Sequence, residues 1–174
     1  MKKLFENLYR SRSNHYIAII VMACLAFSSG CDKKQGVKTG DKPPGISGTD
    51  IHGEFVNLNQ FKGNVTILYF WTKSCCGERI KQLEPYYSMN KHKGLAIFAI
   101  NVGNTREIIE AYAKDNGLTF TLQTDERAMT SREYGVFGFP TIFILDREGT
   151  IRKKILGDID TAQLEKLVAH YLVE

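Results

Sequence analysis

Two nearly continuous runs of apolar residues stand out along the chain, at 65–71 and at 95–102. Both contain β-branched and aromatic side chains, and neither alternates between polar and apolar positions as a strand with one exposed face would. We therefore expect each run to form a central β-strand that is covered by other elements on both faces.

The segment between these runs predicts a helix that begins near a pair of adjacent cysteines. Apolar positions follow a helical spacing from Cys75 or Cys76 to about residue 91, and Pro85 is expected to kink this helix because proline lacks a backbone donor. The first turn of a helix presents free N–H groups and the positive end of the helix dipole, and both favour thiolate over thiol. The cysteine pair is therefore the first candidate for chemistry.

The rest of the chain also alternates between strands and helices. In the helix that should follow Asn104, the expected core stripe is Ile108, Ile109 and Tyr112. The other expected elements are a short strand within 55–58, a helix after the capping box Asn104-x-x-Glu107, a strand at 119–123, a short helix at 126–134, a strand after Pro140, its hairpin partner at 150–156 and a final helix from Asp160. This order predicts an α/β fold in which a central mixed β-sheet is flanked by helices on both faces.

The first thirty residues have the pattern of a targeting segment. Four basic residues precede or flank an apolar core at 17–27, and Ser28-Ser-Gly then leads into Cys31. This segment resembles a bacterial lipoprotein signal peptide, which implies cleavage before Cys31 and lipidation of its sulfur; Cys24 is a competing site. The alternative is a plain N-terminal membrane anchor, although an apolar run this short does not comfortably span a bilayer.

The expected domain organisation follows from this segment. We expect a signal peptide at 1–30, a flexible polar tether at 31–44 and a single folded domain at 45–174. Outside the first thirty residues, 19 basic and 18 acidic side chains remain, so the net charge of +4 belongs mostly to the targeting segment. The charge therefore gives no support for nucleic-acid binding, which needs a basic patch or stripe.

Only Cys75 and Cys76, of the four cysteines in the chain, remain as thiols in the expected domain. They do not form a disulfide framework, because ordinary disulfides need a longer Cα separation than adjacent residues offer. The four histidines are scattered without ligand spacing, so we expect no metal site and no cofactor. A Cu(I) carrier that uses both thiols is the one metal alternative, because soft thiolates suit Cu(I).

Two motifs flank the cysteine pair in a specific order. Gly63-Asn-Val-Thr-Ile-Leu-Tyr-Phe-Trp71 precedes it, and Gly135-Val-Phe-Gly-Phe-Pro140-Thr141 with Asp146-x-x-Gly149 follows it. Over about residues 45–172 the chain resembles the TlpA/ResA-like envelope branch of the thioredoxin superfamily, which implies a thioredoxin fold. The resemblance also implies that Pro140 is cis, lies beside the active thiol and presents the Phe139 backbone to an extended substrate segment.

Members of that branch carry a Cys-x-x-Cys pair, in which the first thiolate attacks a substrate disulfide and the second resolves the mixed disulfide. Counted from Trp71, Cys75 matches the attacking cysteine and Glu78 takes the resolving position. A shift by one residue makes Cys76 the nucleophile and Arg79 the replacement, and the sequence leaves both registers open. Neither register restores a second cysteine at the required spacing.

The function that we expect is that of an envelope thiol–disulfide oxidoreductase, which acts on protein disulfides through a single or vicinal cysteine site. The expected catalytic residues are Cys75, Cys76 and Pro140, and the expected substrate groove contains Trp71, Phe139, Glu78 and Arg79. One alternative is a redox-inactive binding module that uses the same groove. The other is a peroxiredoxin-like peroxide reductase, which the Thr72-x-x-Cys75 spacing resembles.

The expected partners follow from this function and from the N-terminal segment. They are a protein disulfide substrate, an upstream envelope reductant and a membrane reached through a lipid on Cys31, without nucleic acid. The folded domain is then expected to face the periplasm as a monomer.

Overall fold

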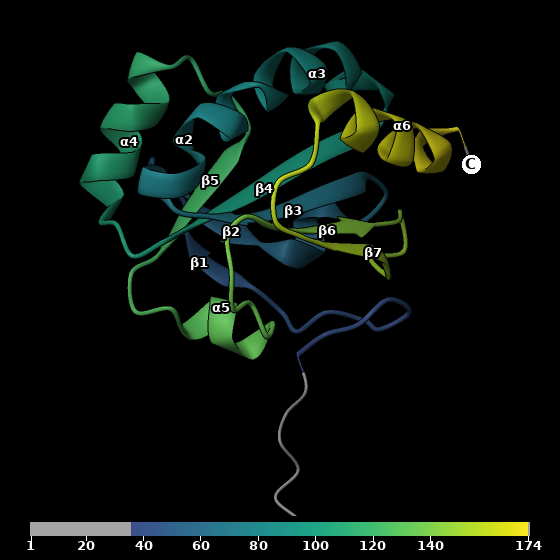
Figure 1. Cartoon of the computed structure of the whole chain (residues 1–174), viewed down its shortest axis with the longest axis horizontal. Coiled ribbons are helices and arrows are strands. Elements are labelled where there is room, and N and C mark those ends of the chain that lie inside the picture. The colour runs from purple at the N-terminus through teal and green to yellow at the C-terminus, as the bar shows by residue number, and fades with distance from the viewer. Residues whose placement is uncertain (1–35, 174) are drawn as a thin grey trace, which may run out of the picture. The chain divides into compact units, whose positions relative to one another are not determined.

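A five-stranded mixed β-sheet forms the centre of the computed structural model, which describes residues 36–173 (Figure 1). Its strand order is β5-β4-β3-β6-β7. Strands β3 (Val65–Trp71), β4 (Leu95–Val102) and β5 (Thr121–Asp125) pair in parallel, whereas β6 (Thr141–Leu145) pairs antiparallel with both β3 and β7 (Ile151–Leu156). The predicted bounds of the two central strands are confirmed, since every residue of β3 and β4 is buried.

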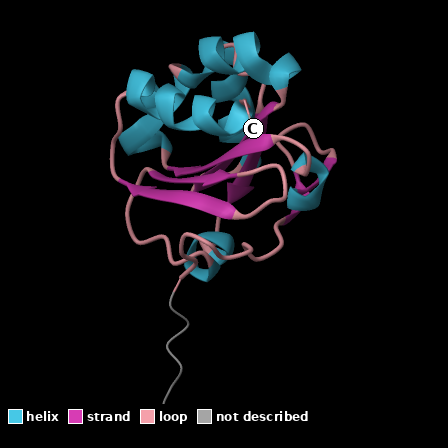
Figure 2. Ribbon diagram, turned by 90° about the vertical axis from the view of Figure 1, so that its right-hand side faces the viewer, coloured by secondary structure: helices cyan, strands magenta, loops and turns pink. Residues whose placement is uncertain are grey.

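Helices cover one face of the sheet, as Figure 2 shows in cyan. They are α2 (Lys73–Lys81), α3 (Leu83–Asn90) with the 3₁₀ turn η2 (Lys91–Lys93), α4 (Arg106–Asp115) and α6 (Thr161–Leu172). The opposite face is covered by α5 (Met129–Glu133), the 3₁₀ turn η1 (Leu58–Phe61) and the hairpin of β1 (Ser47–Thr49) with β2 (Phe55–Asn57). This arrangement is a thioredoxin-like fold and confirms the predicted fold class.

Strand β3 shows how a continuous apolar run serves both layers of the core. Its side chains alternate between the two faces of the sheet, as they must in an extended strand. Val65, Ile67, Tyr69 and Trp71 join the core beneath α2, α3, α4 and α6, whereas Leu68 and Phe70 join the core beneath α5 and η1. No polar face remains, which explains why the run lacks alternation.

The predicted kink at Pro85 is confirmed, since the helix divides at Gln82, three residues before the proline. Pro85 itself lies in the first turn of α3, where its missing backbone donor is tolerated. Two other details of the helix predictions are wrong. The predicted capping box at Asn104 does not form, because the N-cap of α4 is Thr105 and its side chain makes no capping hydrogen bond. Ile108 is 44% exposed and not part of the core stripe, in which Ala113 joins the predicted Ile109.

The prediction of a flexible tether up to residue 44 is also wrong from residue 36 onward. The amide of Gly40 donates to the carbonyl of Ile151 at 2.7 Å, and the amide of Ile151 donates to Asp41 at 3.0 Å. A β-carbon at Gly36 would lie only 2.3 Å from Cα of Gly135, so the two glycines allow a close backbone approach. Residues 36–44 are therefore part of the folded domain.

Residues 1–35 lie outside the described residues, so the structure does not bear on the predicted signal peptide, on Cys24 or on Cys31. Within residues 36–173, no helix is both long and apolar enough to cross a membrane.

Candidate active site

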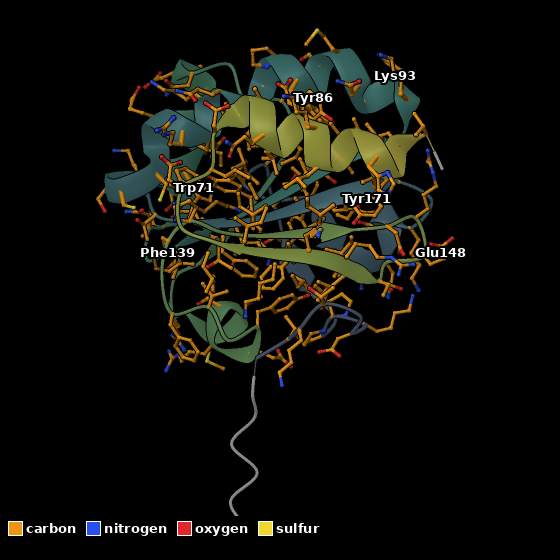
Figure 3. All side chains as sticks on the ribbon, turned by 45° about the vertical axis from the view of Figure 1, so that its right-hand side comes forward. Trp71, Tyr86, Lys93, Phe139, Glu148 and Tyr171 are labelled. Carbon is orange, nitrogen blue, oxygen red and sulfur yellow. The ribbon has the colours of Figure 1, made fainter. Side chains whose placement is uncertain are left out.

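The antiparallel pairing of β3 with β6 brings the cysteine pair and the Pro140 loop together. Phe70, near the end of β3, pairs with Thr141, the first residue of β6. The residues directly after β3 therefore meet the residues directly before β6. Figure 3 shows the result at the labelled residues: Trp71 and Phe139 lie at the same end of the sheet, while Glu148 lies at the other end.

Cys75 is the exposed member of the pair. It is the third residue of α2, which begins at Lys73 after Thr72 as N-cap, and its Sγ is 3.5 Å from the carbonyl oxygen of Phe139. The first turn of α2 contains no acidic residue that would oppose a thiolate there. Cys75 therefore combines access to solvent, a helix N-terminus and contact with the loop before Pro140.

The peptide bond between Phe139 and Pro140 is cis, which confirms the prediction. Two hydrogen bonds fix this loop: the hydroxyl of Thr141 donates to the carbonyl of Gly138 at 2.7 Å, and the amide of Gly157 donates to the carbonyl of Pro140 at 2.8 Å. The loop is therefore fixed internally and tied to the residue that follows β7.

Cys76 is only 1% exposed and belongs to the apolar core beneath α2. Burial raises the pKa of its thiol to about 12; a hydrogen bond with Cys75 also raises it, whereas hydrogen bonds with Thr72 lower it. The two sulfurs are 2.9 Å apart. Cys76 is therefore placed to contact Cys75, but burial keeps it in the thiol form at neutral pH.

The two positions that replace a resolving cysteine both carry exposed charges. Glu78 shares a helix face with Cys75, because residues three apart lie on the same side of a helix. Its carboxylate pairs with Lys81 at 2.6 Å and its side chain is 85% exposed. Arg79 pairs with Asp158 at 2.7 Å, and both side chains are about half exposed. Neither Glu78 nor Arg79 can act as a second thiol. Exposed ion pairs of this kind also add little stability.

Trp71 was expected in the substrate groove, but it lies in the core beneath the site and not on its surface. Its side chain is fully buried, and its ring is 5.6 Å from the ring of Tyr112 on α4. The hydroxyl of Tyr112 in turn donates to the carbonyl of Gly77 at 2.5 Å. Trp71 therefore supports the contact between α4 and α2 from below.

The sequence reasoning missed two features around the site. One is Phe137 in the Pro140 loop, which is 90% exposed although it is aromatic. The other is an open depression of about 600 Å³, lined by Lys73, Ser74, Cys75, Gly77, Glu78, Asn104, Tyr112 and Asn116. A search for large apolar residues in predicted loops would have found Phe137. No sequence pattern links the residues of the depression, because they come from separate elements.

The comparisons with known proteins agree with this geometry. A model of the AhpC/TSA family matches residues 39–154, so the chain belongs to that family. It is 29% identical over 136 residues to the thiol-disulfide oxidoreductase ResA of Bacillus thuringiensis subsp. konkukian, covering 77% of this chain and 79% of that one. It is 26% identical over 159 residues to the sporulation thiol-disulfide oxidoreductase A of Bacillus subtilis, covering 86% and 93%.

Solved structures of thiol–disulfide proteins are also similar to this chain. The crystal structure of StoA from Bacillus subtilis superposes with a TM-score of 0.61 at 27% identity and covers 76% of this chain and 98% of that one. A thiol:disulfide interchange protein from Bacteroides sp. gives a TM-score of 0.68 at 26% identity, with coverage of 79% and 92%.

The difference in burial predicts a large difference in reactivity between the two thiols. At pH 8, a thiol with a pKa of about 12 is ionised in about one molecule in 10,000. We expect iodoacetamide to modify Cys75 at least about 100-fold faster than Cys76 in the native protein. Tandem mass spectrometry of the tryptic peptide 74–79 separates the two sites.

In guanidinium chloride the two rates should converge, because unfolding removes the burial that raises the pKa of Cys76. Equal rates in the native protein would contradict the assignment of Cys76 as an inert thiol.

Proposed function

We propose that this chain is a thiol–disulfide oxidoreductase that uses Cys75 as its only nucleophile. The observation that carries the proposal is the exposed sulfur of Cys75 at the start of α2, 3.5 Å from the backbone of the residue before cis-Pro140. A disulfide-bearing segment that lies along Phe139 and Pro140 would bring its sulfur within reach of Cys75.

The first step needs only one thiolate. The Cys75 thiolate attacks one sulfur of the substrate disulfide, a bond forms between Cys75 and that sulfur, and the second substrate sulfur leaves as a thiolate. The N–H groups and the dipole of α2 stabilise the attacking charge.

The second step differs from that of an enzyme with two accessible cysteines. Residue 78 is a glutamate, and Cys76 is buried with a raised pKa. The mixed disulfide on Cys75 therefore waits for a thiol from outside the chain.

The surface beside Pro140 supports a polypeptide substrate. Phe137 is 90% exposed, and Leu156, which pairs with Thr141 across β6 and β7, is 69% exposed. Two large apolar side chains thus flank the loop that adjoins Cys75. A segment of unfolded polypeptide offers apolar side chains that would bury this surface.

We expect the Cys75→Ala variant to reduce insulin with dithiothreitol no faster than the uncatalysed reaction. The Cys76→Ala variant should keep its rate within about threefold, because Cys76 contributes packing and not chemistry. Turbidity of the released insulin chain measures both rates.

Other outcomes identify the alternatives. Loss of activity in Cys76→Ala with retention in Cys75→Ala would make Cys76 the nucleophile. No exchange in the parent, with polypeptide capture that persists in the double variant, would favour the binding module. Peroxide consumption with a sulfenic acid trapped on Cys75 would instead favour peroxide reduction.

A second expectation concerns Phe137. The Phe137→Ser variant should raise KM for insulin about tenfold, since burial of a phenylalanine contributes on the order of 1.5 kcal/mol or more. Its rate with cystine, which carries no apolar polypeptide segment, should not change. Met89→Ser, which alters a comparably exposed side chain on α3, is the control. An equal effect on both substrates would show that Phe137 does not contact the polypeptide.

We also propose that the domain acts outside the cytoplasm, held to a membrane by a lipid on Cys31. The support is the sequence Ser28-Ser-Gly-Cys31 after an apolar core, directly before the folded domain that is described from residue 36. The partners would then be an envelope protein disulfide and an envelope thiol.

The Cys31→Ser variant tests this location. We expect the parent to fractionate with membranes after expression in a Gram-negative host and to carry a lipid-modified N-terminus. The variant should lack this modification, because the sulfur that carries the lipid is missing. Mass spectrometry of the mature N-terminus is the measurement. An unmodified Met1 start in the parent would overturn the proposal.

A further inference from the structure

The two sides of Cys75 differ in chemistry. Strand β3, which leads to Cys75, lies between β6 and β4 in the sheet. Pro140 and the exposed Phe137 belong to the β6 side, whereas the depression lies on the β4 side, against Asn104 after β4 and against α4. Cys75 therefore stands between an apolar surface and a polar depression.

We propose that this depression binds a low-molecular-weight thiol that carries both a carboxylate and an ammonium group, such as cysteine or a small peptide thiol. This thiol would release the substrate from Cys75 and regenerate the enzyme. The inference rests on the proposed function and identifies the class of external thiol that it requires.

The size of the depression suits a small molecule. Its volume of about 600 Å³ falls within the range of pockets for small ligands, about 300–1,000 Å³. Among its lining residues none is a large aliphatic side chain, and Tyr112 is the one aromatic. The apolar segments of a polypeptide thus have little to bury there.

The charges in the depression suit a zwitterion. Lys73 opens α2, where a ligand carboxylate would also meet free backbone N–H groups. Glu78 lines the same depression from a later turn of α2; burial raises the pKa of the adjacent Tyr112, and the Glu78 carboxylate raises it further. Glu78 and the half-buried amide of Asn104 would then receive the ligand ammonium group, which would replace Lys81 beside the Glu78 carboxylate.

Unpaired polar groups lie under the depression. Trp71 and Asn101 are register partners on β3 and β4, both fully buried, and they sit on the sheet face that α2 and α4 cover. Nε1 of Trp71 and both side-chain polar atoms of Asn101 have no hydrogen-bond partner among the described residues. Buried polar groups are rarely left without a partner, so we expect ordered water beneath Tyr112; neither residue lines the depression itself.

The topology also suits the direction of attack. Displacement at sulfur places the incoming and the leaving sulfur on opposite sides of the attacked atom. A small thiolate in the depression would attack Cys75 from the β4 side, while the substrate sulfur leaves on the Pro140 side.

The reaction balances with two small thiols. The first thiolate forms a bond to the sulfur of Cys75, the bond between Cys75 and the substrate breaks, and the substrate sulfur takes up a proton. The second small thiol attacks the first, which forms their symmetric disulfide and returns Cys75 as a thiolate. The substrate disulfide gains two electrons, and two small thiols are oxidised.

The test uses the full chain with Cys75 preloaded with 5-thio-2-nitrobenzoate, whose release is coloured. Its release is measured against the concentration of glutathione, cysteine, cysteamine, 3-mercaptopropionate and 2-mercaptoethanol, each corrected for its thiolate fraction. We expect the rates with glutathione or cysteine to saturate and, at low concentration, to exceed that with 2-mercaptoethanol about tenfold or more.

Charge variants separate the two halves of the site. Lys73→Gln should lower the release rate with carboxylate-bearing thiols, relative to 2-mercaptoethanol, about threefold or more. Glu78→Gln should lower the relative rate with ammonium-bearing thiols by a similar factor. Lys93→Gln and Glu148→Gln are matched controls, because Figure 3 places both residues away from Trp71. These controls should leave the selectivity unchanged.

The outcomes distinguish the two proposals. If Cys75 does not take up nitrobenzoate, the proposed function fails and the inference fails with it. If Cys75 is loaded but every thiol reacts linearly, in proportion to its thiolate alone, the small-thiol site is overturned while the function stands. The same conclusion follows if Lys73→Gln and Glu78→Gln behave like the controls.

Discussion

The antiparallel register between β3 and β6 is the constraint on which the site depends. Because Phe70 pairs with Thr141, the start of α2 and the loop that ends at Pro140 must meet at the same end of these two strands. The fully buried side chains of both strands hold this register, since a slip of one residue would turn their apolar side chains to the wrong face. The distance of 3.5 Å between Cys75 and Phe139 is a consequence of that pairing.

Helix geometry then assigns different roles to the adjacent cysteines. Successive residues of an α-helix point about 100° apart, so two neighbours cannot both face the Pro140 loop. Cys75 faces solvent and Cys76 enters the core beside Ile80. A Cys-x-x-Cys pair avoids this conflict, because residues three apart share a face, and Glu78 occupies that position here. The vicinal pair is therefore not equivalent to the dithiol that it resembles in sequence.

The sequence predicted well the parts that have a local cause or a family motif. Strands β3 and β4 were located by nearly continuous apolar runs, and the cis form of Pro140 was implied by the family resemblance. The choice between Cys75 and Cys76 depends on where α2 begins and how it rotates against the sheet, and no residue pattern records this rotation. The docking of residues 36–44 uses backbone hydrogen bonds to Ile151, which leave no side-chain pattern to detect. The depression joins α2, α4 and the loop after β4, so only the fold assembles it.

The absence of a resolving thiol affects the release of the substrate more than the first attack on the substrate disulfide. In a dithiol enzyme the second cysteine acts within the same molecule, at a high effective concentration, and limits the lifetime of the mixed disulfide. Here the exposed position on that helix face is a carboxylate, and the remaining thiol is held in the core. In the proposed mechanism, turnover then depends on the supply of an external thiol, and a bound substrate stays attached until that thiol arrives. A polar depression directly beside Cys75 is the feature that such a mechanism needs, because binding of the second reactant restores the proximity that the missing cysteine would have provided.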